Sequence, residues 1–125
     1  MFPEYLAAAM VRVFHCDDSR AFRALIRAEL EDDADIEVIG DSGDFPGALV
    51  GVTACQPDVL LLDLLDVELD VVSEVAAVAP STQVVVLSGH PREYGEPLRA
   101  DAAAYVEKDA PLAFLRETVL RVAAE

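Results

Sequence analysis

Polar side chains of the kinds that handle phosphoryl groups follow four short apolar runs of this chain. They are Asp17 and Asp18 after residues 11–16, Asp63 after residues 59–62, Ser88 after residues 84–87, and Lys108 after residues 105–107. Three neighbouring carboxylates repel one another unless a cation lies among them. Mg²⁺ binds one or two carboxylates together with phosphate oxygens, and an aspartate can form an acyl phosphate. The residue types therefore predict a magnesium-dependent phosphoryl site.

The expected role of each residue follows from the chemistry of its polar group. Asp18 and Asp63 are predicted to bind Mg²⁺ directly, Asp17 directly or through water, and a backbone carbonyl after Asp63 to complete the protein's ligands. Lys108 is the only lysine of the chain. Its ammonium and the hydroxyl of Ser88 are predicted to contact the phosphoryl oxygens on the side away from the metal. Singly, each residue could be a turn, a cap or a solvated charge, so the prediction depends on their joint occurrence.

The four apolar runs, with a fifth at residues 36–39, are predicted to be buried strands. The runs at residues 59–62 and 84–87 are continuous stretches of Val and Leu, as expected when both faces of a parallel sheet are covered. Segments with helical spacing separate them. We expect helices after Ser19, from about Asp44, from about Asp70 with its end before Pro80, over residues 91–100, and from Pro111 to Val122.

Proline and glycine modify three of these expected helices. Pro46 and Pro111 are predicted to lie in the first turns of the second and last helices, where proline is favoured. Gly47 and Gly51 weaken the second helix, because glycine costs helix stability. The helix over residues 91–100 contains Gly95 and Pro97 and is predicted to be short, kinked or frayed.

Strands that alternate with helices predict an α/β fold with right-handed crossovers. We expect a doubly wound, five-stranded parallel sheet of strand order 2-1-3-4-5 with helices on both faces. This order places the first and third strands side by side, so Asp17, Asp18 and Asp63 should meet where the strand order reverses. Ligands of such sheets bind outside the carboxyl ends of the strands at that point.

Composition limits the remaining possibilities. The chain has 125 residues, 54% of them hydrophobic, which suits one domain; we expect a flexible N-terminal extension over residues 1–10 and the domain over residues 11–125. The net charge of −15 opposes the phosphate backbone, so direct nucleic-acid binding is not expected. Cys16 and Cys55 are predicted to be reduced, mostly buried thiols of a cytoplasmic protein. No apolar stretch reaches membrane-spanning length, so no membrane contact is expected.

These residues resemble a known family, the receiver domain of two-component response regulators. The resemblance covers residues 11 to 124. It is carried by the acidic pair Asp17-Asp18, Asp63 after residues 57–62, Ser88-Gly89, and Tyr105 three residues before Lys108. Residues 36–40 and 108–111 are similar to the NarL/LuxR-type branch, whose members usually carry a DNA-binding domain after the receiver. The resemblance implies the flavodoxin-like fold.

The resemblance also implies a mechanism. A sensor histidine kinase or a phosphotransfer protein would donate a phosphoryl group to Asp63 with Mg²⁺ bound, and the backbone carbonyl of Leu65 would be a metal ligand. Ser88 would then move and Tyr105 would swing inward as switch residues, although Tyr105 could also be a plain, partly buried aromatic. The change would be read by an output protein, by a separate or removed DNA-binding domain, or by a second copy in a homodimer.

Three other functions share part of this residue pattern or the predicted sheet order. Val67 and Val71 replace the family's usual proline and glycine, so a receiver-like interaction module that works without phosphorylation stays an alternative. A phosphatase of the haloacid dehalogenase type needs a second aspartate two residues after the nucleophile, where this chain has Leu65, and Asp66 comes one residue too late. A flavodoxin-like nucleotide binder needs a phosphate loop that the acidic residues after the first strand would repel. We therefore do not expect an enzyme.

Overall fold

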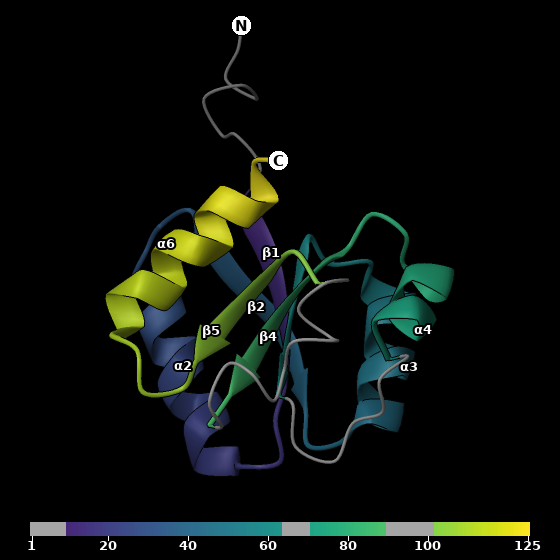
Figure 1. Cartoon of the computed structure of the whole chain (residues 1–125), viewed down its shortest axis with the longest axis horizontal. Coiled ribbons are helices and arrows are strands. Elements are labelled where there is room, and N and C mark those ends of the chain that lie inside the picture. The colour runs from purple at the N-terminus through teal and green to yellow at the C-terminus, as the bar shows by residue number, and fades with distance from the viewer. Residues whose placement is uncertain (1–9, 64–70, 90–101) are drawn as a thin grey trace, which may run out of the picture.

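The computed structural model of the chain describes residues 10–63, 71–89 and 102–125. Five parallel strands form one sheet of order β2-β1-β3-β4-β5, which confirms the predicted order (Figure 1). The strands are β1 (Val11–Cys16), β2 (Ile36–Ser42), β3 (Val59–Asp63), β4 (Gln83–Ser88) and β5 (Ala104–Glu107). The helices are α2 (Arg20–Glu31), α3 (Phe45–Cys55), α4 (Val71–Val78) and α6 (Leu112–Ala123).

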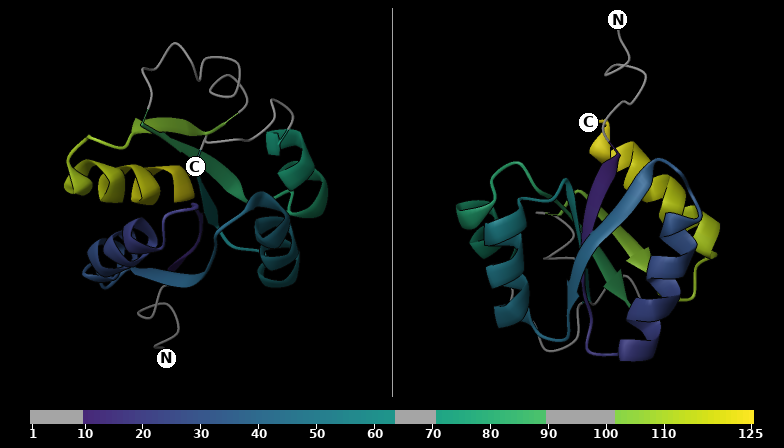
Figure 2. Two further views of the ribbon diagram at one scale, coloured as in Figure 1. Left: turned by 90° about the horizontal axis from the view of Figure 1, so that it is seen from below. Right: turned by 180° about the vertical axis from the view of Figure 1, so that it is seen from behind.

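Helices cover both faces of the sheet, as Figures 1 and 2 show. On one face, Val13, Leu61 and Val85 pack with buried residues of α2 and α6. On the other face, Leu60 and Val86 belong to the core under α3 and α4. Because successive strand residues face opposite layers and both layers are apolar, β3 and β4 are apolar without interruption over residues 59–62 and 84–87.

Three of the helices have an N-cap residue that identifies where the helix begins. Ser19 caps α2 by accepting a hydrogen bond from the backbone N–H of Phe22 at 3.1 Å. Asp44 caps α3 in the same way and accepts from Gly47 N at 2.7 Å. These two starts confirm the predictions. Pro111 differs: it is the N-cap of α6 with an extended ψ of 139°, so the prediction that it lies inside the first turn was wrong by one residue.

Strand β2 runs through Gly40 to Ser42 and is longer than predicted. Its pairing with β1 shifts by one residue, because Val13 pairs with Val38 and Phe14 with Gly40. The ring of Phe14 needs space there, because a Cβ built on Gly40 would lie 2.9 Å from it, and one on Gly51 of α3 would lie 2.4 Å from it. Gly51 thus weakens α3 as an isolated helix, but its missing side chain lets the helix pack on the sheet.

Several predictions fall outside the described residues. They concern residues 1–9 of the extension, the start of a helix at Asp70, the Leu65 carbonyl with Asp66 and Val67, and the helix over residues 91–100 with Gly95 and Pro97. In the part of the chain that the structure describes, no helix combines the length and the apolar character needed to cross a membrane.

Candidate functional site

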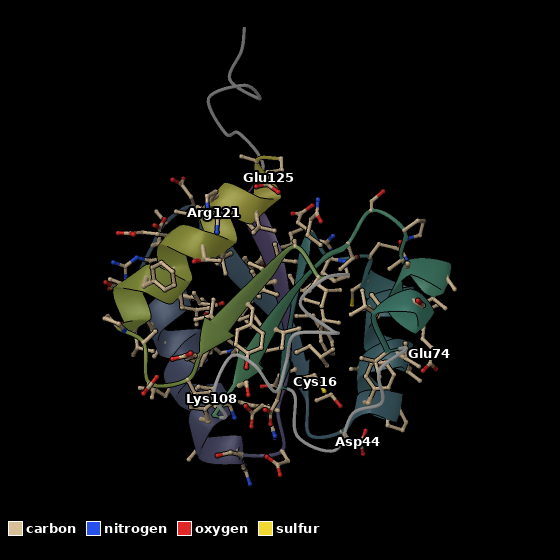
Figure 3. The ribbon with its side chains drawn as sticks, in the orientation of Figure 1. Cys16, Asp44, Glu74, Lys108, Arg121 and Glu125 are labelled. Carbon is tan, nitrogen blue, oxygen red and sulfur yellow. The ribbon has the colours of Figure 1, made fainter. Side chains whose placement is uncertain are left out.

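The predicted site residues lie at the carboxyl ends of the strands, along one edge of the sheet. Asp63 ends β3, opposite Leu87 of β4, and Ser88 ends β4. The backbone N–H of Lys108 donates to the carbonyl of Ser88 at 2.7 Å, which fixes the residue after β5 beside the end of β4. Figure 3 shows Lys108 at the same end of the molecule as Cys16 of β1 and opposite Glu125.

Three carboxylates meet at this edge. Asp17, Asp18 and Asp63 each offer one oxygen, and these oxygens all lie within 4.8 Å of one another. Asp17 and Asp63 are buried, whereas Asp18 is exposed. Backbone contacts hold Asp17 in place: its N–H donates to Ser42 O at 3.0 Å, and its Oδ1 accepts from Ser19 N at 2.8 Å. An all-oxygen donor set with one solvent-facing member fits a hard divalent cation such as Mg²⁺.

Lys108 places its charge between two of these carboxylates. Its Nζ lies 2.7 Å from Asp17 Oδ2 and 3.4 Å from Asp63 Oδ1, and 4.6 Å from the centre of the Phe22 ring. Partial burial by itself lowers the pKa of Lys108, but Asp17 and Asp63 outweigh it and the pKa lies above its usual value. The positive charge of Lys108 therefore lies 3.4 Å from Asp63, and its contact with a phosphoryl group stays a prediction.

Arg23 on α2 also positions the acidic loop, a role that the sequence did not reveal. Its guanidinium donates to the backbone carbonyl of Asp17 at 2.6 Å, and its Nε lies 3.7 Å from Asp41 Oδ2 at the end of β2. In the sequence Arg23 looks like a solvent-facing residue beside the apolar stripe of the helix. Its position four residues after the cap Ser19 was the available indication, because a long side chain there can reach back to the preceding loop.

His15 is a second residue of the site that the sequence reasoning missed. It is 1% exposed within β1, and its ring meets that of Phe22 edge-on at 5.9 Å. Its Nε2 lies 3.9 Å from Asp17 Oδ2. Burial lowers the pKa of His15 to about 4, against the opposing effect of Asp17, so the ring is neutral at neutral pH. A polar residue inside an otherwise apolar run was the indication in the sequence.

The two expected switch residues lie at or beside the same edge. Ser88 is buried at the end of β4. Tyr105 is half-buried on β5, where it pairs with Val86, and it lines a hollow of about 330 Å³ together with Ala110 and Phe114. Both have contacts in the structure, and their movement stays a prediction.

The chain is similar in sequence and in structure to several known proteins. No protein-family model matches it. The protein-glutamate methylesterase/protein-glutamine glutaminase 5 of Myxococcus xanthus is 37% identical in an alignment of length 109 that covers 82% of this chain and 31% of that protein. The protein-glutamate methylesterase/protein-glutamine glutaminase 1 of Caulobacter vibrioides is 46% identical over 56 residues, which cover 45% of this chain and 16% of that protein. The chain thus spans less than a third of the length of these curated relatives.

A solved structure decides the family. The signal receiver domain of the putative response regulator NarL from Mycobacterium tuberculosis aligns with a TM-score of 0.84 at 27% identity, over 93% of this chain and 98% of that one. The chain is a response regulator receiver domain. Its strand order and its flavodoxin-like fold are those that the sequence predicted, and the likeness to a NarL-type receiver agrees with the resemblance to that branch. The acidic edge described above is therefore the edge of a receiver domain.

Proposed function

We propose that this receiver domain accepts a phosphoryl group on Asp63 in Mg²⁺-dependent two-component signalling. One observation carries the proposal: the buried carboxylate of Asp63 lies 3.4 Å from the ammonium of Lys108 and within 4.8 Å of oxygens of Asp17 and Asp18. Phosphoryl transfer depends mainly on positioning and on neutralising charge. A carboxylate flanked by a fixed cation and by a place for a divalent ion meets both needs.

The residues of the site have different parts in the transfer. An oxygen of Asp63 attacks the phosphorus of a phosphohistidine on a sensor kinase or phosphotransfer protein; the P–O bond forms, the P–N bond breaks, and the imidazole leaves. Lys108 and the hydroxyl of Ser88 bind the phosphoryl oxygens. Asp17, Asp18 and Asp63 would hold Mg²⁺ with the Leu65 carbonyl, and the ion would neutralise charge on the phosphoryl group.

Phosphorylation changes the charge at one end of the sheet, and we propose Ser88 and Tyr105 as the residues that respond. The receiver then acts as a cytoplasmic switch rather than an enzyme. Its signal would pass to an output protein, to a DNA-binding domain in another part of the protein or on another chain, or to a second copy of the receiver. The chain would contact neither nucleic acid nor membrane itself.

The test is incubation with acetyl phosphate and Mg²⁺, followed by intact-protein mass spectrometry. The wild type should gain the mass of one phosphoryl group, Asp63→Asn should gain none, and chelation of the metal should prevent the gain. Asp35→Asn is the matched control, because Asp35 is an exposed aspartate that precedes β2 at the other end of the sheet. An unmodified wild type, or equal modification of Asp63→Asn, would refute the proposal.

A second candidate function is an interaction module that works without phosphorylation. The hollow beside Tyr105 favours it, because Phe114 at its border is 48% exposed and could anchor a partner. The two candidates differ in one measurement. Partner binding that is unchanged in Asp63→Asn supports the second function, whereas binding that requires phosphorylation of Asp63 supports the first.

A further inference from the structure

His15 is a buried polar side chain with no hydrogen bond to the part of the chain that the structure describes. It is 1% exposed, and it lies on the face of β1 that also buries Val13, against the ring of Phe22. Neither ring nitrogen has a hydrogen-bond partner among the described residues. Buried groups of this kind are rare, because each unmade hydrogen bond costs free energy. An aliphatic residue would fill the position without this cost.

The ring directs one nitrogen toward the acidic edge. Nε2 of His15 lies 3.9 Å from Oδ2 of Asp17, about 1 Å beyond a normal hydrogen bond. The other oxygen of Asp17, Oδ1, already accepts from Ser19 N. Oδ2 is buried, and among the described residues no donor makes a hydrogen bond of good geometry to it, although Lys108 Nζ is 2.7 Å away. Lys108 Nζ and His15 Nε2 therefore both lie near the same oxygen.

Lys108 is shared between two carboxylates. Its backbone is fixed to Ser88 O, while its Nζ lies near both Asp17 Oδ2 and Asp63 Oδ1. A phosphoryl group on Asp63 brings further negative oxygens to the second partner and attracts the ammonium away from the first. Asp17 Oδ2 would then be a buried, charged oxygen that has lost the ammonium beside it, which is unfavourable unless another donor replaces the ammonium.

We propose that His15 is a positioning residue that supplies this donor: when Lys108 turns to a phosphoryl group on Asp63, His15 Nε2–H donates to Asp17 Oδ2. The proposal rests on the proposed phosphorylation of Asp63. The neutral ring needs the tautomer with its proton on Nε2. The hydrogen bond then holds Asp17 in its orientation toward the metal, as outer partners of metal-binding carboxylates do. His15 contacts neither the metal nor the phosphoryl group.

The first test is NMR of the imidazole nitrogens in the intact, ¹⁵N-labelled chain. Beryllofluoride with Mg²⁺ serves as the phosphoryl mimic. We expect His15 to be the Nε2–H tautomer, and its Nε2 proton to move downfield and exchange more slowly when the mimic binds. The spectrum of Asp63→Asn should not change. A proton on Nδ1, or a bound mimic that leaves the His15 signals unmoved, would overturn the proposal.

The second test compares two substitutions. His15→Leu removes the donor, whereas His15→Gln keeps an N–H group of similar reach. At saturating Mg²⁺, we expect His15→Leu to weaken beryllofluoride binding about tenfold and His15→Gln to restore most of it. Mg²⁺ binding without the mimic should change less than twofold in both, because Lys108 still accompanies Asp17 in that state.

The outcomes separate this proposal from the one on which it rests. If the wild type binds no mimic, phosphorylation of Asp63 is refuted and the role of His15 with it. If the wild type binds the mimic and both variants bind it equally well, only the role of His15 is refuted. Equal losses of Mg²⁺ and mimic binding in His15→Leu would also refute it, because they would indicate a general structural defect. If a variant does not fold, the NMR experiment on the wild type decides.

Discussion

The burial of His15 predicts how the stability of the metal-free protein depends on pH. The perturbation is His15→Leu, which replaces the imidazole by an apolar side chain of similar size in the core around β1 and α2. Burial lowers the pKa of His15 from 6.5 to about 4. Asp17 and Asp41 oppose this shift and Lys108 and Arg23 reinforce it.

The size and sign of the effect follow from proton linkage. Between pH 6.5 and pH 4 the unfolded chain binds a proton on His15 that the folded chain does not, so acid favours unfolding. The stability conferred by the neutral ring is present above pH 6.5 and is lost as the pH falls toward 4. At about 1.4 kcal/mol per pH unit, the loss between pH 7 and pH 5 is about 2 kcal/mol. His15→Leu should lack this part of the pH dependence.

Urea unfolding at a series of pH values, followed by circular dichroism, measures the effect. The free energy of unfolding of the wild type should fall about 2 kcal/mol more than that of His15→Leu between pH 7 and pH 5. The chain has one other histidine, His90, and His90→Gln serves as the control for loss of an imidazole. Parallel pH profiles of the wild type and His15→Leu would refute the reasoning, whichever protein is the more stable.

Two further predictions concern the charge of the site and the packing under α3. Lys108→Gln should bind Mg²⁺ roughly tenfold more tightly by titration calorimetry, because Mg²⁺ no longer has to compete with the ammonium for Asp17; unit charges 2.7 Å apart attract by about 1.5 kcal/mol even at the dielectric constant of water. Arg121→Gln is the control: it loses an exposed cation on α6 and should change the affinity for Mg²⁺ less than twofold. Equal effects of the two substitutions would contradict the prediction. Gly51→Ala should lower the free energy of unfolding in urea by about 1 kcal/mol. Overpacking against the ring of Phe14 costs about 1–3 kcal/mol, which exceeds the gain of about 1 kcal/mol in helix propensity. In a Phe14→Leu background, the same substitution should be neutral or stabilising.

The sequence predicted the strand order and the acidic edge because both follow from local patterns. Continuous apolar runs identify buried parallel strands, and the residues directly after them must lie at one edge. Asp17, Asp63 and Lys108 were therefore found without knowledge of any contact. The caps Ser19 and Asp44 were equally local, since each bonds a backbone N–H three residues away.

What the sequence did not show depends on contacts between distant elements. The ring of Phe14 lies against Gly40 of β2 and Gly51 of α3, so the reason for Gly51 is not in its own helix. The roles of His15 and Arg23 likewise depend on how α2 lies on the sheet. The guanidinium of Arg23 reaches back to the backbone carbonyl of Asp17, and the charge of a side chain in the sequence does not reveal such a contact.

The position of the only lysine has a practical consequence for labelling. Apart from the α-amino group, Lys108 is the single amine in the chain, and its raised pKa and two carboxylate neighbours keep it protonated. An amine-directed reagent is therefore also a site-directed one: its slow reaction at Lys108 reports on the acidic edge alone. Ligands that draw the ammonium away from Asp17, or cover it, should change the labelling rate of the single peptide that contains Lys108.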